Sequence, residues 1–396
     1  MVEAFTVAAV RTADGRRNGR LSGWYPADLA AQVLDALMAR TDCDPALVGD
    51  MIMGCVGQID EQAGNIGRDA VLASRLPESV PETSVDRQCG SSQQALHFAA
   101  QAVMSGSMDV LIAAGVERMS RVPINTPMSV PAKNGMGFYV SPTMQLRYPD
   151  VQFSQFMGAK MLVRKCGLDK PALDAFARQS HQRAAASTRA GAVTAEIVPL
   201  AVRINDGSLD GQSDGELHAI DEGIRFNATL EGIANVKLLQ QGGALTAASA
   251  SQICDGAAGL MVVNERGLKA LGVAPLARVH PMTVLGQDPV IMLEAPVLAT
   301  ARALQKAGMS IDEIDLFEVN EAFASVPLAW LQATDAAPVR LNVNGGAIAL
   351  GQLLGGSGAR QMTTLVHGLQ ARCKRDSPQT LCEGGGLANV TINERL

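Results

Sequence analysis

Short apolar runs that alternate with amphipathic segments set the tightest limit on how this chain can fold. Residues 5–10, 51–56 and 110–116 are apolar runs of strand length. Residues 26–40, between the first two runs, repeat apolar side chains at helical spacing. Strands that alternate with helices in this way predict a parallel or mixed sheet that helices cover on both faces.

The second half of the chain repeats this pattern. Strand-length runs return at residues 259–263 and 314–319, and a helical pattern covers residues 295–307. The two halves share the pattern without clear residue identity. The sequence therefore predicts two similar α/β halves with a boundary near residue 265.

Composition excludes several classes of protein. The net charge of −6 and the pI near 5.5 argue against a nucleic-acid partner. The chain has 7 cysteines and no C-x-x-C pair, so we expect neither a disulfide framework nor a metal site. We expect a reducing, cytoplasmic location, no signal peptide and no membrane span.

One long stretch, residues 121–156, shows no period at all. Pro, Asn, Met and Tyr are mixed there without a helical or strand pattern. Irregular stretches of this length are usually functional loops. Helical patterns resume at residues 157–168 and 171–190, and a polar excursion is expected at residues 206–222.

Cys89 is the first residue that indicates chemistry. Turn-forming residues precede it and a helical pattern follows it, so we expect it at a helix start. A helix N-terminus favours the reactive thiolate, and Arg87 would add to this effect. A small buried residue in a turn is the plainer interpretation. A second cysteine in a glycine-rich setting, Cys382, favours the functional one.

Four clusters stand out together. They are Cys89-Gly90-Ser91, residues 319–324, residues 342–360, and the glycine-rich run that begins at Cys382. Each has a plain structural interpretation by itself. Asn320, in the second cluster, is compatible with the cap of a helix over residues 320–332, and the glycines are compatible with tight turns.

Taken together, the four clusters resemble the thiolase family, and the resemblance extends over nearly the whole chain. It implies an α/β, thiolase-like fold of two similar βαβαβαββ halves in a five-layered α-β-α-β-α arrangement. The N-terminal half would span residues 1–265, with an inserted loop domain at about 120–243, and the C-terminal half residues 266–396. Members of the family are homodimers or homotetramers.

The resemblance also implies an activity in fatty-acid and lipid metabolism. The chain would be an acyl-CoA C-acyltransferase that cleaves 3-ketoacyl-CoA with coenzyme A, or condenses acyl-CoA, through an acyl-cysteine intermediate. Coenzyme A and acyl-CoA would be substrates, with no permanently bound cofactor. Cys89 would be the nucleophile and Cys382 the acid/base.

The resemblance assigns four further residues to this reaction. The N–H groups of Cys89 and Gly384 would hold one oxyanion, and Asn320 would hold a water that forms part of the other. Ser251 would contact the pantetheine chain of coenzyme A. Met157 would lie beside the same pocket, although a core role suits a methionine equally well.

The chain departs from the family at the Gly-His-Pro motif, which is Gly351-Gln352-Leu353 here. In the family this histidine deprotonates the nucleophile. Gln352 keeps a hydrogen-bond donor but has no titratable nitrogen, and the loss of a general base costs ~10²- to 10⁴-fold in rate. Two alternatives follow: an acyl-CoA-binding protein with weak or no turnover, and a different thioester chemistry such as hydrolysis.

Smaller departures accompany this one. Phe156 stands where the family often has histidine, so substrate contacts in the loop domain would differ. Glu383 would either raise the pKa of Cys382 or point to solvent. The histidines of the chain fall in no matching motif and are expected to be ordinary surface or core residues; they are His97, His181, His218, His280 and His367.

Overall fold

The computed structural model describes residues 2–206 and 215–396. Most of its strands join one 11-stranded sheet in the order β11-β12-β13-β10-β1-β9-β5-β3-β4, with β2 beside β9 and β6 beside β1. The strands of this sheet are β1 (Phe5–Thr12), β2 (Gly15–Arg16), β3 (Asp50–Gly54), β4 (Glu82–Val85), β5 (Val110–Arg118), β6 (Ile197–Val198), β9 (Cys254–Val263), β10 (Ala277–Gly286), β11 (Glu318–Val319), β12 (Asp376–Glu383) and β13 (Leu387–Arg395). A separate pair consists of β7 (Leu200–Ala201) and β8 (Leu217–His218).

The sheet has two halves that meet at one short junction. Strands β3, β4, β5, β9 and β1 form the N-terminal half, and β10 to β13 form the other. Only Phe5 and Thr6 of β1 pair with β10, opposite Arg278 and Ala277. The halves are therefore free to stack on one another away from that junction.

Helices fill the space around and between the halves. They are α1 (Pro26–Thr41), α2 (Ile66–Ala73), α3 (Ser91–Ser105), α4 (Thr126–Lys133), α5 (Pro142–Arg147), α6 (Gln155–Lys165), α7 (Lys170–Arg189), α8 (Leu230–Ala234), α9 (Glu265–Leu271), α10 (Ala295–Ala307), α11 (Ser325–Thr334) and α12 (Ser357–Ala371).

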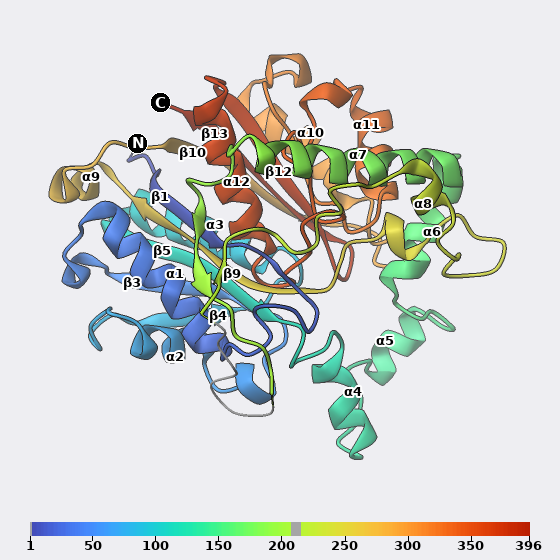
Figure 1. The fold of residues 1–396 in the computed structure, drawn as a ribbon, viewed down its shortest axis with the longest axis horizontal. Coiled ribbons are helices and arrows are strands. Elements are labelled where there is room, and N and C mark those ends of the chain that lie inside the picture. The colour runs from blue at the N-terminus through green and yellow to red at the C-terminus, as the bar shows by residue number, and fades with distance from the viewer. Residues whose placement is uncertain (1, 207–214) are drawn as a thin grey trace.

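The layers follow from which helices touch which strands. Helix α1 packs on β1, β5 and β9, and α10 packs on β10, β12 and β13. Helices α3 and α12 contact each other and strands of both halves, so they form the central layer (Figure 1). Strands β1, β5 and β9 are buried along their whole length because both faces of the sheet are covered. The predicted five-layered α/β fold is confirmed.

Several local predictions need correction. Residues 121–156 are not without structure, because α4 and α5 form there and project from the body as an arm (Figure 1). The segment 320–324 is not helical, since α11 begins only at Ser325. Part of the predicted polar excursion, residues 207–214, lies outside the described residues. Within the described chain, no helix is long and apolar enough to cross a membrane.

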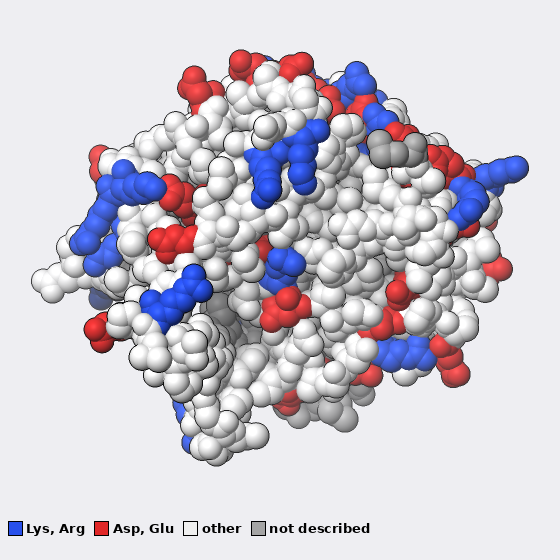
Figure 2. All heavy atoms as spheres, turned by 180° about the vertical axis from the view of Figure 1, so that it is seen from behind, with Lys and Arg blue, Asp and Glu red and all other residues white. Residues whose placement is uncertain are grey.

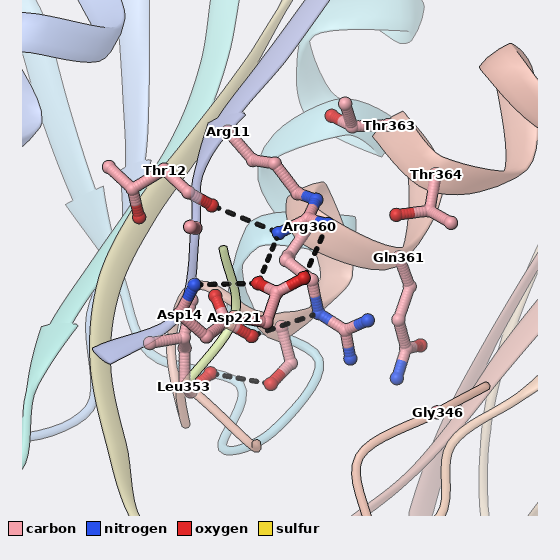
Figure 3. Close-up of polar contacts among 12 residues, drawn as sticks. Arg11, Thr12, Asp14, Asp221, Gly346, Leu353, Arg360, Gln361, Thr363 and Thr364 are labelled. Atoms are coloured by element: carbon pink, nitrogen blue, oxygen red, sulfur yellow. Dashed lines mark hydrogen bonds and ion pairs between the residues drawn. The ribbon is translucent and has the colours of Figure 1, made fainter. Parts of the chain in front are cut away.

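A buried cluster of charges ties the parts of the chain together (Figure 3). Arg11 of β1 donates from Nη1 to Oδ1 of Asp221 at 2.7 Å. It also donates from Nε to Oε1 of Glu196 at 2.7 Å. The backbone N–H of Asp14 donates to the same Asp221 oxygen at 2.7 Å. Arg360 of α12 lies 3.7 Å from Asp14. The C-terminal helix is thereby linked to β1 and to the segment that carries Asp221.

We predict that this cluster contributes strongly to stability. The variant Asp221→Ala removes one of the two carboxylates that pair with Arg11. An incompletely paired buried charge lowers the free energy of unfolding by about 3–5 kcal/mol. Lys165→Ala, which breaks an exposed ion pair with Glu294, should change it little. Urea unfolding followed by circular dichroism measures both variants. Equal effects would contradict the assigned role of the cluster.

Candidate active site

Cys89 lies in a tight turn immediately before α3. The helix begins at Ser91 with Gly90 as its N-cap. Gln88 has a φ of 50°, in the left-handed region that side chains seldom adopt. The N–H of Gly90 donates to the carbonyl of Arg87 at 3.1 Å, and Ser91 Oγ donates to the carbonyl of Gln88 at 2.6 Å. This strained, closed turn fixes the direction of the Cys89 side chain.

The C-terminal half holds this helix start in place. The N–H of Ser92 donates to the carbonyl of Gly355 at 3.0 Å, and Ser92 Oγ accepts from the N–H of Ala359 at 2.8 Å. The N–H of Gly355 donates to Glu117 of β5 at 2.8 Å. The loop before α12 is therefore anchored to both α3 and the N-terminal sheet.

Cys382, near the end of β12, faces the same space as Cys89. Burial raises the pKa of the Cys382 thiol well above its usual range, and the charges of Cys89 and Glu383 add to this. Next along the chain, a Cβ on Gly384 would lie 2.8 Å from Oε1 of Gln88, so its backbone packs against the Cys89 turn. The structure thus brings Cys89, Cys382 and Gly384 together from the two halves.

The thiol of Cys89 is difficult to ionise. Cys89 is only 8% exposed. Burial raises the pKa of its thiol to about 12, and the negative charge of Glu383 is the second cause of this rise. A hydrogen bond from the side chain of Gln352 acts in the opposite direction. The expectation that the helix start would favour the thiolate was wrong for the free protein, because desolvation outweighs the partial charge of the helix end.

Gln352 lies close to Cys89, and a hydrogen bond from its side chain lowers the pKa of that thiol. Its N–H donates to the carbonyl of Gln252 at 2.9 Å. Gly351 has a φ of 123°, and a Cβ there would lie 2.6 Å from Cys254 Sγ, so this position requires glycine. The amide donates to Cys89, and its Oε1 is buried without a partner among the described residues. Gln352 can donate to the thiolate but cannot take its proton.

Asn320 is buried at the end of β11 and caps no helix. Its N–H donates to the carbonyl of Thr380 at 3.0 Å, which places it beside β12. Its Oδ1 accepts from Nε2 of Gln361 at 2.6 Å. Its Nδ2 is buried without a partner in the described part of the chain. An unsatisfied buried donor of this kind leaves Asn320 free to bind a ligand or a water.

Two of the histidines are already engaged by other residues. His97 lies on α3, and its Nε2 is 2.7 Å from Thr391 Oγ1 of β13. Burial lowers the pKa of His97 to about 3, so the ring is neutral. His181 accepts a hydrogen bond from the N–H of Arg225 at 3.2 Å and lines a different cavity from the one beside Gln352.

Glu383 is fully buried at 0% exposure, so the prediction that it might point to solvent was wrong. Burial raises the pKa of Glu383 to about 8, and the charge of Arg87 opposes this rise. Its own charge raises the pKa of both Cys89 and Cys382. The first of the two expectations for Glu383, that it raises the pKa of Cys382, is the one the structure supports.

A cavity of about 230 Å³ opens beside Gln352. Ser251 lines it, and so do Phe156 and Phe323, whose rings pack edge-to-face with centroids 5.3 Å apart. Met157 is 41% exposed, so the core alternative was wrong, and it is not among the lining residues. Sequence analysis identified the motif that contains Phe323 but did not assign this residue to the site.

A second cavity of about 520 Å³ adjoins the first. The two share Ala247 and Gln252, and Arg225 and Thr229 line the second one. Sequence reasoning missed this cavity because no motif or periodicity marks residues 225–232.

No group of three or more potential metal ligands occurs among the described residues. The face in Figure 2 carries interspersed basic and acidic side chains.

Comparisons with known proteins agree on one family. The family model "Thiolase, N-terminal domain" matches residues 4–266, and "Thiolase, C-terminal domain" matches residues 273–395. The chain is 46% identical over 401 residues to "Steroid 3-ketoacyl-CoA thiolase FadA6" of Mycobacterium tuberculosis, which covers 100% of this chain and 95% of that protein. It is 38% identical to "3-ketoacyl-CoA thiolase" of Cronobacter sakazakii, with 100% of each chain covered.

The fold also matches solved structures. The crystal structure of human mitochondrial 3-ketoacyl-CoA thiolase in complex with CoA superposes with a TM-score of 0.88 and 32% sequence identity. The match covers 100% of this chain and 98% of the human chain.

The burial of Cys89 predicts a late response to pH. Its alkylation by iodoacetamide should still be increasing above about pH 9.5, because its raised pKa leaves little thiolate at lower pH. Free cysteine, with a pKa of about 8.5, levels off earlier and is the reference. Mass spectrometry of the Cys89 peptide across a pH series measures the rate. A plateau below about pH 8 would contradict the dominance of desolvation.

Proposed function

This chain belongs to the thiolase family, and we propose that it is a 3-ketoacyl-CoA thiolase that transfers acyl groups through Cys89. Coenzyme A thioesters are its substrates, and it needs no permanently bound cofactor. The single observation that carries the assignment of roles is the meeting of two buried thiols, Cys89 and Cys382, from the two halves of the fold.

In the first half-reaction Cys89 attacks the ketone carbon of a 3-ketoacyl thioester. The carbon–carbon bond breaks, the acyl group stays on Cys89 as a thioester, and an acetyl-CoA enolate departs. Cys382 protonates that enolate. Its raised pKa suits an acid, because the proton is held until a strong base forms beside it.

In the second half-reaction the thiol of coenzyme A gives its proton to Cys382 and takes the acyl group from Cys89. Each step develops charge on an oxygen, which hydrogen-bond donors must stabilise. We assign one oxyanion to the N–H groups of Cys89 and Gly384. We assign the other to a water held by the unpartnered Nδ2 of Asn320, and the amide of Gln352 supports the thiolate.

The two adjoining cavities suit a long coenzyme A substrate. The smaller one, beside Gln352, would take the reacting thioester and the end of the pantetheine chain at Ser251. The larger one would take the nucleotide end, where Arg225 supplies a positive charge for phosphate. Met157 lies outside both linings but next to Phe156, so a contact with bound substrate remains our proposal for it.

Three coarser features complete the proposal. We propose the division into residues 1–265 and 266–396, with a loop domain at about 120–243. We propose a homodimer or homotetramer, because the arm that carries α4 and α5 exposes Met136, Phe138 and Leu146. We propose a cytoplasmic location on the basis of the odd number of cysteines and the lack of a C-x-x-C pair.

Two other functions are less compatible with this site. An acyl-CoA-binding protein with little turnover gains support only from Gln352, and the relatives described above are named as enzymes. Hydrolysis of an acyl-cysteine needs no second thiol beside the nucleophile, so Cys382 would have no role in it. The retained pair of thiols favours acyl transfer over both.

The proposed function predicts thiolysis that depends on Cys89. The native protein should consume acetoacetyl-CoA, a longer 3-ketoacyl-CoA or a steroid-derived 3-ketoacyl-CoA in the presence of coenzyme A. It should also carry an acyl adduct on Cys89 in mass spectra. Cys89→Ala should abolish both signals, whereas Cys373→Ala, at an exposed cysteine, should abolish neither. An adduct that survives Cys89→Ala would exclude the assignment.

A restored histidine should accelerate the reaction. Gln352→His with Leu353→Pro introduces an imidazole that can take the Cys89 proton, and its charged form should lower the pH at which iodoacetamide reacts. We expect a gain in thiolysis of about tenfold or more, up to the ~10²- to 10⁴-fold worth of a base. Gln352→Leu with Leu353→Pro changes the loop without an imidazole and is the matched control. A variant no faster than this control would show that position 352 does not limit the rate.

A further inference from the structure

We propose that Glu383 accepts the proton of Cys89 during acylation, in a chain whose residue 352 cannot do so. The inference rests on the proposed function and adds one catalytic residue to it.

Glu383 lies directly against the turn that carries the nucleophile. It ends β12, where it pairs with Leu387 of β13. A Cβ on Gly90 would collide with Oε1 of Glu383 and would lie 2.6 Å from its Cδ. The carboxyl group therefore occupies the space above Gly90, next in sequence to Cys89. Glycine at position 90 is required for this approach.

Both oxygens of Glu383 are available. Each is buried and has no hydrogen-bond partner among the described residues. The N–H of Asn389 is close enough to favour the charged form, as is the charge of Arg87. Arg87 makes no ion pair with Glu383 within the described chain, and its own Nε is buried without a partner. A buried carboxyl group without hydrogen-bond partners destabilises the folded protein, so its presence here indicates a functional role.

The other carboxylates near Cys89 are occupied. Asp86, in the same turn, accepts the N–H of Gln88 at 2.7 Å. Glu117 accepts N–H groups of Val56, Gly57 and Gly355 at 3.0, 3.0 and 2.8 Å. Of the two carboxylates whose charge acts on Cys89, Glu383 has the larger effect on the pKa of the thiol and Asp86 the smaller. Glu383 combines that influence with two buried oxygens that have no hydrogen-bond partner in the described chain, whereas Asp86 is exposed.

The electrostatics of the site favour a transfer between these two groups. Burial raises the pKa of Glu383 to about 8, so it exchanges protons in the range where a thiol must lose one. The titratable groups with which it interacts are Arg87 of the turn, Cys89 before α3, and Cys382 of its own strand. Arg87 is the only cation among them, and it favours the carboxylate that waits for the proton.

The transfer keeps the number of buried charges constant. The proton moves from Sγ of Cys89 to an oxygen of Glu383, directly or through one water, while Sγ bonds to the ketone carbon. The negative charge of the carboxylate passes to the substrate, and the number of buried charges does not increase. Ionisation of Cys89 into solvent would instead place a second negative charge beside Glu383, at a large desolvation cost.

The cycle closes without another reactant. Cys382 gives its proton to the departing enolate and regains one from the thiol of coenzyme A. The coenzyme A thiolate then takes the acyl group and releases Cys89 as a thiolate. That thiolate recovers its proton from Glu383, which returns to the carboxylate. Every proton and every negative charge is thereby accounted for.

The test separates acylation from simple thiol reactivity. Glu383→Gln keeps the shape of the side chain and removes its charge and basicity. Single-turnover acylation of Cys89 should fall by ~10²- to 10⁴-fold, the worth of a general base. Alkylation of Cys89 by iodoacetamide at about pH 7 should not fall, because loss of a neighbouring negative charge lowers the pKa of the thiol. A carboxylate that merely disfavours the thiolate predicts that both rates rise.

Two further variants sharpen the result. Glu383→Asp keeps a carboxylate on a shorter side chain and should retain part of the acylation rate. Glu318→Gln is the matched control: Glu318 is also buried, burial raises its pKa to about 8, and its Oε1 also lacks a partner in the described chain. It lies outside the proposed machinery, so acylation should change little. In the native chain the acylation rate should rise with pH as Glu383 loses its proton near pH 8, and Glu383→Gln should lose that rise.

The background with Gln352→His and Leu353→Pro gives an independent check. There the imidazole can take the proton, so Glu383→Gln should slow acylation much less than in the native chain. An undiminished acylation rate in Glu383→Gln, or a parallel loss of acylation and alkylation, would overturn the proposal. A native protein that neither thiolyses nor acylates would instead overturn the proposed function, so the two failures are distinguishable.

Discussion

The close approach of α3 and α12 in the central layer is the constraint on which the site depends. A Cβ on Gly358 of α12 would collide with the backbone nitrogen of Gln93 of α3, so the helices touch through backbone atoms. Ser92 completes the contact with hydrogen bonds to Gly355 and Ala359. Helix α3 contacts both sheet halves, and its start lies against the end of β12. Two cysteines that are far apart in the sequence meet there as a result.

Tight packing buries the side chains of this region, and that burial dominates their pKa values. Burial is the first cause of the raised pKa of Cys89, Cys382 and Glu383 alike. Under these conditions a charge is tolerated only beside a partner, as Arg11 is beside Asp221. Near the nucleophile the opposite charge that acts on Glu383 is that of Arg87. Proton movements that leave the charge count unchanged are therefore the inexpensive ones.

The fold was largely predictable because the spacing of apolar residues indicates helices and strands. The site was predictable only through motifs. The helix predicted at residues 295–307 and the buried run at 110–116 were found because apolar spacing is a local property. The helix predicted from Asn320 was wrong, since hydrogen bonds to Thr380 and Gln361 hold that residue instead. Desolvation of Cys89 and the cavity at Arg225 were invisible, because both depend on segments that only the tertiary structure brings together.

The exchange of histidine for Gln352 fits the charge balance of this site. A neutral amide beside Cys89 adds a donor but no charge, so Arg87 remains the cation that acts on Glu383, and Glu383 remains the carboxyl with the larger effect on Cys89. An imidazolium at position 352 would be a second cation, and it would stabilise a thiolate in addition to the carboxylate. With glutamine that extra negative charge has no partner, so the thiol cannot ionise in advance and must lose its proton as it attacks. A base with open oxygens next to the turn is what such a site requires, and Glu383 is the group that the packing of Gly90 places there.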